Sequence, residues 1–150
     1  MEKNILAYSE TALDYGVIGL LILMSIVTLW LFIERMMFYS TVDIEKYTHR
    51  DILEMDLTNN ISVISAIGSN APYVGLLGTV IGIMLTFYTM GDASAIDAKK
   101  IMVGLALALK ATAMGLIVAM PAIVAYTILL RKVEKILTIF DVNQEEKASN

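Results

Sequence analysis

The chain has 150 residues, is 57% hydrophobic, carries a net charge of −4 and contains no cysteine, and its mean hydropathy is +0.70. The lack of cysteine excludes disulfides, thiolate catalysis and zinc–thiolate sites, and the charge balance provides no basic surface for a nucleic acid. Because most of the chain is apolar, too few residues remain to fold a soluble domain of the size of an enzyme. We therefore expect a protein that is not an enzyme and holds no metal or cofactor.

Three long runs without a charged residue determine the fold class. They are Tyr15 to Ile33, Leu57 to Gly91 and Ala111 to Leu130. About 20 apolar residues in a helix cross the hydrocarbon core of a bilayer. The sequence therefore predicts an all-α membrane protein with three transmembrane helices, the first of them a retained anchor rather than a cleaved signal peptide. The predicted spans cover residues of about 14–36, 70–91 and 101–130.

The second run and the tail are longer than one bilayer requires. A helix over the whole second run would extend roughly 52 Å, whereas the hydrocarbon core is roughly 30 Å thick. In the tail, apolar residues recur at helical spacing between charges from Val133 to Phe140. We therefore expect the second and third helices to extend into the cytoplasm. The expected connections are a cytoplasmic loop at about 37–62, a periplasmic loop at about 92–100 and a cytoplasmic tail at 131–150.

Basic residues predict the orientation, because they are more frequent in cytoplasmic segments. Seven lie in the first loop region and the tail, and three lie in the N-terminal segment and the second loop. This places the N-terminus in the periplasm and the C-terminus in the cytoplasm. The two groups are Arg35, Lys46, Arg50, Arg131, Lys132, Lys135 and Lys147, against Lys3, Lys99 and Lys100.

Small residues on the second and third spans form faces on which membrane helices can approach closely. Packing alone is the simpler interpretation of these faces, and the alternative is that they also line a pore or assemble the chain into a homo-oligomeric ring. A proline lies at a similar distance from the connecting loop on each span. The residues concerned are Pro72, Gly75, Gly78 and Gly82 on the second span, and Gly104, Ala108, Gly115 and Pro121 on the third.

Two threonines share these faces at one depth. Thr79 lies 13 residues before Asp92, and Thr112 lies 12 residues after Lys100, so an antiparallel hairpin brings both to the same level. Paired hydroxyls at that level could support a polar path through the membrane. Alternatively, each hydroxyl bonds the carbonyl four residues earlier in its own helix, as threonine often does. The spacing alone leaves both interpretations open.

Two segments resemble a known family. Residues 71–84, APYVGLLGTVIGIM, are similar to the second transmembrane helix of the ExbB/TolQ/MotA family, and residues 111–126, ATAMGLIVAMPAIVAY, are similar to its third. The resemblance is specific over about residues 71–130 and is strongest to the ExbB branch, with the TolQ branch second. It implies a proton-driven motor subunit of the bacterial inner membrane that forms a ring, typically a pentamer.

The resemblance also implies partners. The ring would surround the transmembrane helices of an ExbD-like single-span protein that brings an aspartate, and a TonB-like protein would carry the work to outer-membrane receptors. In the family, two helix threonines line the ring interior near that aspartate, and they match Thr79 and Thr112. The alternatives are a TolQ-type subunit of the Tol-Pal envelope system and a non-conducting membrane scaffold. A flagellar stator of the MotA type normally has an additional span and a larger cytoplasmic domain.

The chain departs from the family pattern at two points. Its first loop is short, and Leu107 stands where relatives often carry an acidic residue, five positions before the third-helix threonine. Lys110 follows three positions later. We interpret Lys110 as a side chain that extends to the outer interface or contacts a neighbouring subunit, because it lies about 200° around the helix from Thr112. A role in the pore is the alternative for Lys110.

Overall fold

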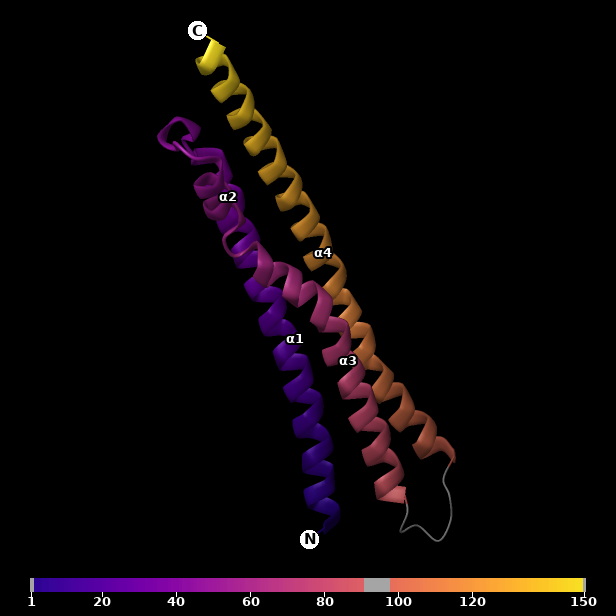
Figure 1. The fold of residues 1–150 in the computed structure, drawn as a ribbon. Helices are drawn as coiled ribbons and strands as arrows, with labels where there is room; N and C mark the ends of the chain where they lie inside the picture. Colours follow the sequence, from indigo (N-terminus) through magenta and orange to yellow (C-terminus); the bar gives the residue numbers. More distant parts are fainter. Residues whose placement is uncertain (1, 91–97, 150) are drawn as a thin grey trace.

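The computed structural model describes the backbone of residues 2–90 and 98–149, and the side chains of residues 15–88 and 98–149. Its elements are α1 (Glu2–Thr41), the short 3-10 helix η1 (Ile44–Lys46), α2 (Arg50–Thr58), α3 (Ile61–Met90) and α4 (Ala98–Ser149). Figure 1 shows an elongated bundle in which α2 lies beside the end of α1, and α3 and α4 form an antiparallel hairpin. Most of the expected periplasmic loop, residues 91–97, lies outside the described residues.

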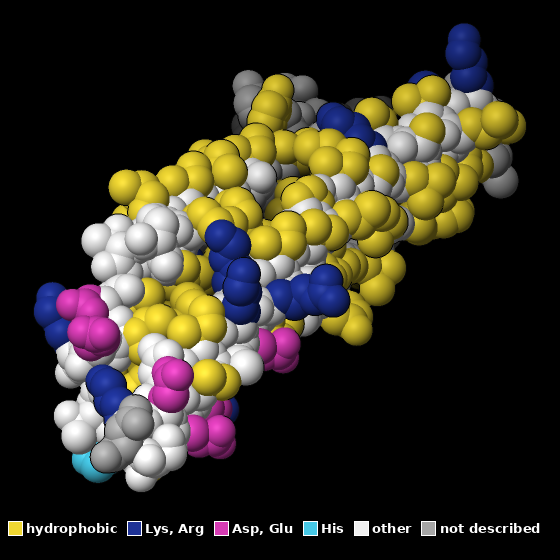
Figure 2. Space-filling model, turned by 90° about the horizontal axis from the view of Figure 1, so that it is seen from above, with side chains coloured by type: hydrophobic (Ala, Val, Ile, Leu, Met, Phe, Trp, Pro, Cys, Tyr) yellow, Lys and Arg dark blue, Asp and Glu magenta, His cyan; other side chains and the backbone are white. Residues whose placement is uncertain are grey.

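Three helical segments are long and apolar enough to cross a membrane: Tyr15–Thr41, Ile61–Tyr88 and Ala98–Ser149. The predicted class, an all-α multi-pass membrane protein with three spans, is therefore confirmed. Figure 2 shows hydrophobic side chains over most of the length of the visible face, with the acidic side chains gathered near one end. This distribution fits a chain whose main solvent is lipid.

The helices extend further than the predicted spans. Helix α1 continues to Thr41, α3 begins at Ile61, and α4 continues to Ser149. The segment predicted as a loop at 37–62 therefore contains the end of α1, η1 and α2, and the predicted tail at 131–150 is helical as far as the structure describes it. Amphipathic packing explains the extension of α4, because Val133, Leu137 and Phe140 are buried on one side of this helix.

A break between α2 and α3 falls at Asn60, which has a φ of 63°. Asparagine adopts this left-handed conformation more readily than most residues. The end of α1 holds the break in place through two bonds. Arg35 Nη1 donates to the backbone carbonyl of Asp56 at 3.1 Å, and the Tyr39 hydroxyl donates to the carbonyl of Leu57 at 2.7 Å. The connection between the first and second spans is therefore tied to α1.

Helix α3 changes direction in the half nearer α2 (Figure 1). Pro72 lies inside the helix in this half. Proline has no backbone N–H, and its ring displaces the carbonyl four residues earlier, so it bends a helix without ending it when neighbouring helices support both halves. Pro121 lies inside α4 in the same way.

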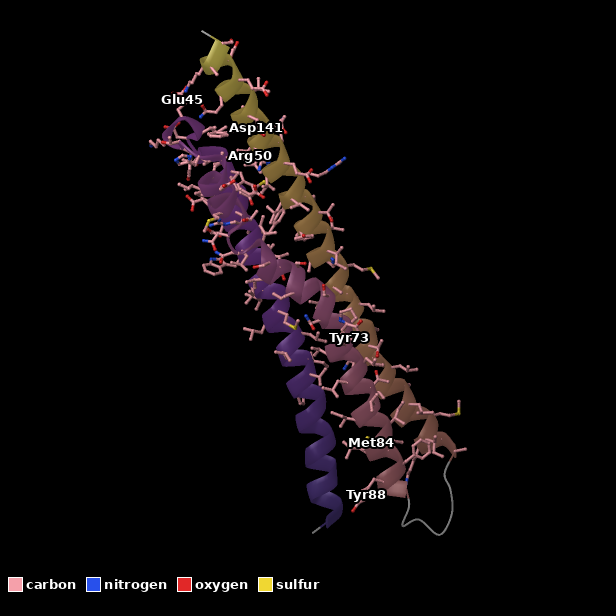
Figure 3. All side chains as sticks on the ribbon, viewed as in Figure 1. Glu45, Arg50, Tyr73, Met84, Tyr88 and Asp141 are labelled. Carbon is pink, nitrogen blue, oxygen red and sulfur yellow. The ribbon has the colours of Figure 1, made fainter. Side chains whose placement is uncertain are left out.

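The buried apolar residues form two clusters along the bundle. The first packs α2 between α1 and the C-terminal half of α4, and Arg50 of α2 contacts Asp141 of α4 at 3.3 Å (Figure 3). The second holds α1 against the hairpin of α3 and α4. Its members are Leu21, Ile67, Ala71, Val118, Ala119 and Ala122. Val74 and Met114 pack against the second cluster, and Val17 of α1 lies against Gly78 of α3.

Candidate functional site

Glycines bring α3 and α4 into backbone contact. A Cβ atom built on Gly115 would lie 2.6 Å from the carbonyl oxygen of Ala71, and one built on Gly75 would lie 2.6 Å from the carbonyl oxygen of Ala111. No side chain larger than hydrogen fits at either position unless the helices separate. The small-residue faces therefore meet each other within one chain, which is the close approach that such faces permit in membranes.

The same contact continues along the hairpin toward the second loop. A Cβ on Gly82 would lie 3.0 Å from Ala108 Cβ, and a Cβ on Gly104 would lie 2.5 Å from the Thr86 side chain. Gly78 faces both α4, at Ala111, and α1, at Val17. These contacts place the predicted packing residues of both spans on the mutual face of α3 and α4.

Thr79 and Thr112 meet in the middle of this face, and their hydroxyl oxygens are in direct hydrogen-bond contact. The Thr79 hydroxyl is also within 3.0 Å of the carbonyl of Ala108 and 3.3 Å of the carbonyl of Gly75. The Thr112 hydroxyl lies 3.4 Å from the carbonyl of Gly75. The antiparallel hairpin thus brings the two threonines to one level, as their distances from the second loop predict.

The two hydroxyls bond across the hairpin more closely than along their own helices. The carbonyl of Ala108, four residues before Thr112, accepts a hydrogen bond from Thr79 on the other helix. In the same way, the carbonyl of Gly75, four residues before Thr79, lies within hydrogen-bond distance of the Thr112 hydroxyl. Each hydroxyl has one proton, so the pair can switch between donor arrangements. The site is a small polar cluster in an otherwise apolar hairpin.

Burial differs between the two threonines. Thr79 is 7% exposed, and Thr112 is partly exposed. Thr86, near the loop end of α3, is 8% exposed and donates to the carbonyl of Gly82 at 2.8 Å. Thr112 is therefore the more accessible member of the pair.

The predicted membrane-spanning parts of the hairpin contain no acid. No Asp or Glu occurs between Leu57 and Gly91 or between Ala98 and Val133. Among the described residues, no group of three or more His, Asp or Glu could hold a metal ion. Threonine hydroxyls do not ionise near neutral pH, so the pair can donate and accept hydrogen bonds but does not itself titrate.

Lys110 lies on the surface of α4, on the side away from the contact with α3. Leu107 and Leu109 beside it are 55% and 60% exposed, and Lys110 is exposed as well. The structure therefore separates Lys110 from the threonine pair, as the helical angle predicts. Pro121 is exposed and Pro72 is partly exposed, so neither proline lies in the tightest part of the hairpin contact.

Sequence reasoning did not anticipate the polar contacts at the α1–α2 end. Arg35 is 6% exposed; it pairs with Glu34 and its guanidinium lies 4.8 Å from the ring centroid of Phe38. Near it, the Tyr47 hydroxyl donates to the carboxylate of Asp56 at 2.9 Å, and this bond raises the pKa of Tyr47. The bond from Arg35 to the Asp56 carbonyl joins residues 21 apart in sequence, so no local pattern indicates it.

The fold and the site define a multi-pass, all-helical membrane protein whose polar centre is a hydroxyl pair in a glycine-packed hairpin. A family model described as the MotA/TolQ/ExbB proton channel family matches residues 30–142. The chain belongs to this family. The resemblance seen in the two hairpin helices is therefore confirmed, and the family is of the transport and proton-channel type.

Individual relatives agree with this assignment. The biopolymer transport protein ExbB of Helicobacter pylori (strain J99 / ATCC 700824) is 54% identical over 127 residues, which cover 85% of this chain and 88% of the relative. The protein of the same name from Aquifex aeolicus is 52% identical over 126 residues, covering 83% and 85%. The Tol-Pal system protein TolQ of Haemophilus influenzae is 40% identical over 80 residues, covering 53% of this chain and 35% of the relative.

Proposed function

We propose that this chain is the ring-forming subunit of a proton-driven motor in the bacterial inner membrane. Its partner would be an ExbD-like single-span protein with an aspartate in the membrane, and the pair would use the proton motive force to energise TonB-dependent transport across the outer membrane. Membership of the proton channel family and identities above 50% to proteins named ExbB support this branch. The N-terminus would be periplasmic and the C-terminus cytoplasmic, as the basic residues predict.

The observation that carries the proposal is the hydroxyl pair of Thr79 and Thr112 within two predicted spans, residues 70–91 and 101–130, that contain no carboxylate. A partner's carboxylate beside this pair would sit in a low-dielectric wall, where burial raises its pKa and makes its charge depend on water access. The threonine hydroxyls would donate hydrogen bonds to the charged carboxylate and accept one from the neutral carboxylic acid. Each proton that moves through a potential of 100 mV releases about 2.3 kcal/mol, which a ring around a partner can convert into stepwise motion.

The ring would be built from surfaces other than the glycine faces. The small-residue faces pack against each other within the chain, as the contacts of Gly75 and Gly115 indicate, and this supports a ring whose subunits meet on other surfaces. Large apolar side chains elsewhere on the hairpin, such as Tyr73 at 68% and Met120 at 62% exposure, remain for lipid or for neighbouring subunits. We propose a homo-oligomer, with a pentamer as the expected form, whose extended ends of α3 and α4 project into the cytoplasm.

A TolQ-type role is the second candidate. It is favoured by the 40% identity of TolQ of Haemophilus influenzae, although this match covers 53% of the chain. A TolQ-type subunit would use the same hydroxyl pair and would drive an envelope system instead of nutrient uptake. The two roles differ in the partner that is recruited.

Co-purification from native membranes tests the proposal. The expected result is a complex that contains several copies of this chain and a single-span protein with an aspartate in its span, and deletion of the gene should abolish uptake of a nutrient that requires outer-membrane energisation. A gene deletion that leaves this uptake intact but disturbs envelope integrity would favour the TolQ-type role. A monomer that recruits no such partner would refute both.

A further inference from the structure

An apolar groove runs between α1 and α4 on the surface of the bundle. Its volume is about 340 Å³, within the range of roughly 300–1,000 Å³ that is typical of ligand pockets. Leu29 and Phe32 line it from α1, and Pro121, Val124 and Ile128 line it from α4. The groove is open to the surroundings of the bundle, at a level where those surroundings are lipid.

Three basic residues continue the same face of α4 beyond the groove. Arg131 and Lys132 follow Ile128 by three and four positions, and Lys135 follows Lys132 by three, so they share one side of the helix with the groove residues. All three are exposed. Among the described residues, no ion pair involves any of them. Glu134 lies in the same turn, so the net charge of the turn remains positive.

The depth of this basic turn matches the surface of the bilayer. The third charge-free run ends at Leu130, and Arg131 follows directly. A run of about 20 apolar residues spans the hydrocarbon core, so the basic turn lies among the headgroups and the groove lies among the acyl chains of the same leaflet. Figure 2 shows basic side chains gathered where the hydrophobic band meets the end that carries acidic side chains.

We propose that this surface binds an anionic phospholipid. One acyl chain would occupy the groove, and Arg131, Lys132 and Lys135 would bind the phosphate-bearing headgroup, since guanidinium and ammonium groups are the side chains suited to phosphate. A second copy of this chain is a poorer occupant. The acids it offers near this level are Glu34, Asp56 and Glu134. Glu34 already pairs with Arg35, and the Asp56 carboxylate already accepts from the Tyr47 hydroxyl. Lipid binding here is independent of the proton path.

Tryptophan fluorescence in vesicles tests the proposal, because bromine atoms on acyl chains quench a tryptophan that they contact. Trp30 is the single tryptophan of the chain; it is 66% exposed and is not among the groove residues. The double variant Leu29→Trp with Trp30→Phe moves the reporter by one position into the groove. The vesicles would be phosphatidylcholine with a minor fraction of either brominated phosphatidylglycerol or brominated phosphatidylcholine.

The expected result is that brominated phosphatidylglycerol quenches the groove tryptophan at least about fivefold more than brominated phosphatidylcholine does, the factor that one cation contributes at an anionic membrane surface. Trp30 in the unmodified chain should show less preference. Adding Lys132→Gln and Lys135→Gln to the groove-reporter variant should lower the preference, because only one of the three cations, Arg131, remains. The control pair Lys46→Gln with Lys147→Gln should leave the preference unchanged.

Three results would overturn the proposal. The first is equal quenching of the groove tryptophan by the two lipids, or an equal preference at Trp30, because either means that no specific site exists. The second is a preference that does not fall when Lys132 and Lys135 are lost. The third is a groove tryptophan that neither lipid quenches, because that result means that protein, such as a second copy of this chain, covers the groove.

Discussion

Replacing Gly115 with leucine should separate α3 from α4 and destabilise the chain. The first atom of any side chain at this position would lie 2.6 Å from the Ala71 carbonyl oxygen and 3.1 Å from Gly75 Cα. Both obstacles are backbone atoms, so no rotamer change relieves the clash. Overpacking costs typically about 1–3 kcal/mol, and a leucine against backbone belongs at the upper end. For a chain of this size, about 3 kcal/mol corresponds to a fall of roughly 6–12 °C in Tm.

The matched control is Gly19→Leu on α1, because a Cβ built on Gly19 meets no other described atom within 4 Å. This control should leave Tm unchanged or raise it slightly, since leucine favours a helix by somewhat less than about 1 kcal/mol relative to glycine. Thermal unfolding in detergent, followed by far-UV circular dichroism, measures both variants. A similar Tm for Gly115→Leu and Gly19→Leu would refute the close contact of α3 with α4.

Further predictions concern orientation and the polar contacts at the α1–α2 end. A cysteine introduced at Ala95 should be labelled by a membrane-impermeant reagent from outside, and one introduced at Thr48 only after the membrane is opened; the reverse pattern would overturn the orientation. Arg35→Met should lower the free energy of unfolding by about 1–3 kcal/mol, because the buried guanidinium's hydrogen bonds to Glu34 and to the Asp56 carbonyl are lost, and hydrogen bonds to a charged group are the stronger kind. An unchanged denaturation midpoint would contradict this. Asp56→Asn should lower the pKa of Tyr47, which tyrosine titration by NMR measures. A tyrosine whose pKa is raised in the folded state adds stability that is lost as the pH rises through that pKa. The variant should therefore lose less stability above about pH 10 than the unmodified chain does.

The spans and the meeting of the threonines could be predicted because both follow from counting along one chain. Charge-free runs define helices of membrane length, and an antiparallel hairpin turns equal distances from a loop into equal depth, which brings Thr79 to Thr112. The charge-free runs did not predict where the helices end. The polar stretch before the predicted second span is helical, and the Asn70 side chain bonds the Ala66 carbonyl at 2.7 Å within α3.

Long-range contacts could not be predicted from local pattern. The sequence indicates that Gly75 and Gly115 favour close packing, but a small-residue face does not specify whether its partner belongs to the same chain or to a neighbour. Likewise, Arg35 reads as an interface residue at the end of a span. Its burial and its bond to Asp56 depend on how α2 folds back against α1, and that is decided by apolar residues distant in sequence.

We propose that the hydroxyls of Thr79 and Thr112 serve the proton path. The most direct test is a double variant with both threonines changed to valine, assayed for uptake of a nutrient that requires outer-membrane energisation. Valine keeps the shape, and the carbonyls of Gly75 and Ala108 keep their helical N–H partners, so the complex should still assemble. We expect the double valine variant to show no uptake and to have no less uptake than the more severely affected single variant, and we expect the corresponding serine variants to retain uptake. Normal uptake in an assembled double valine variant would show that the hydroxyls do not serve the proton path.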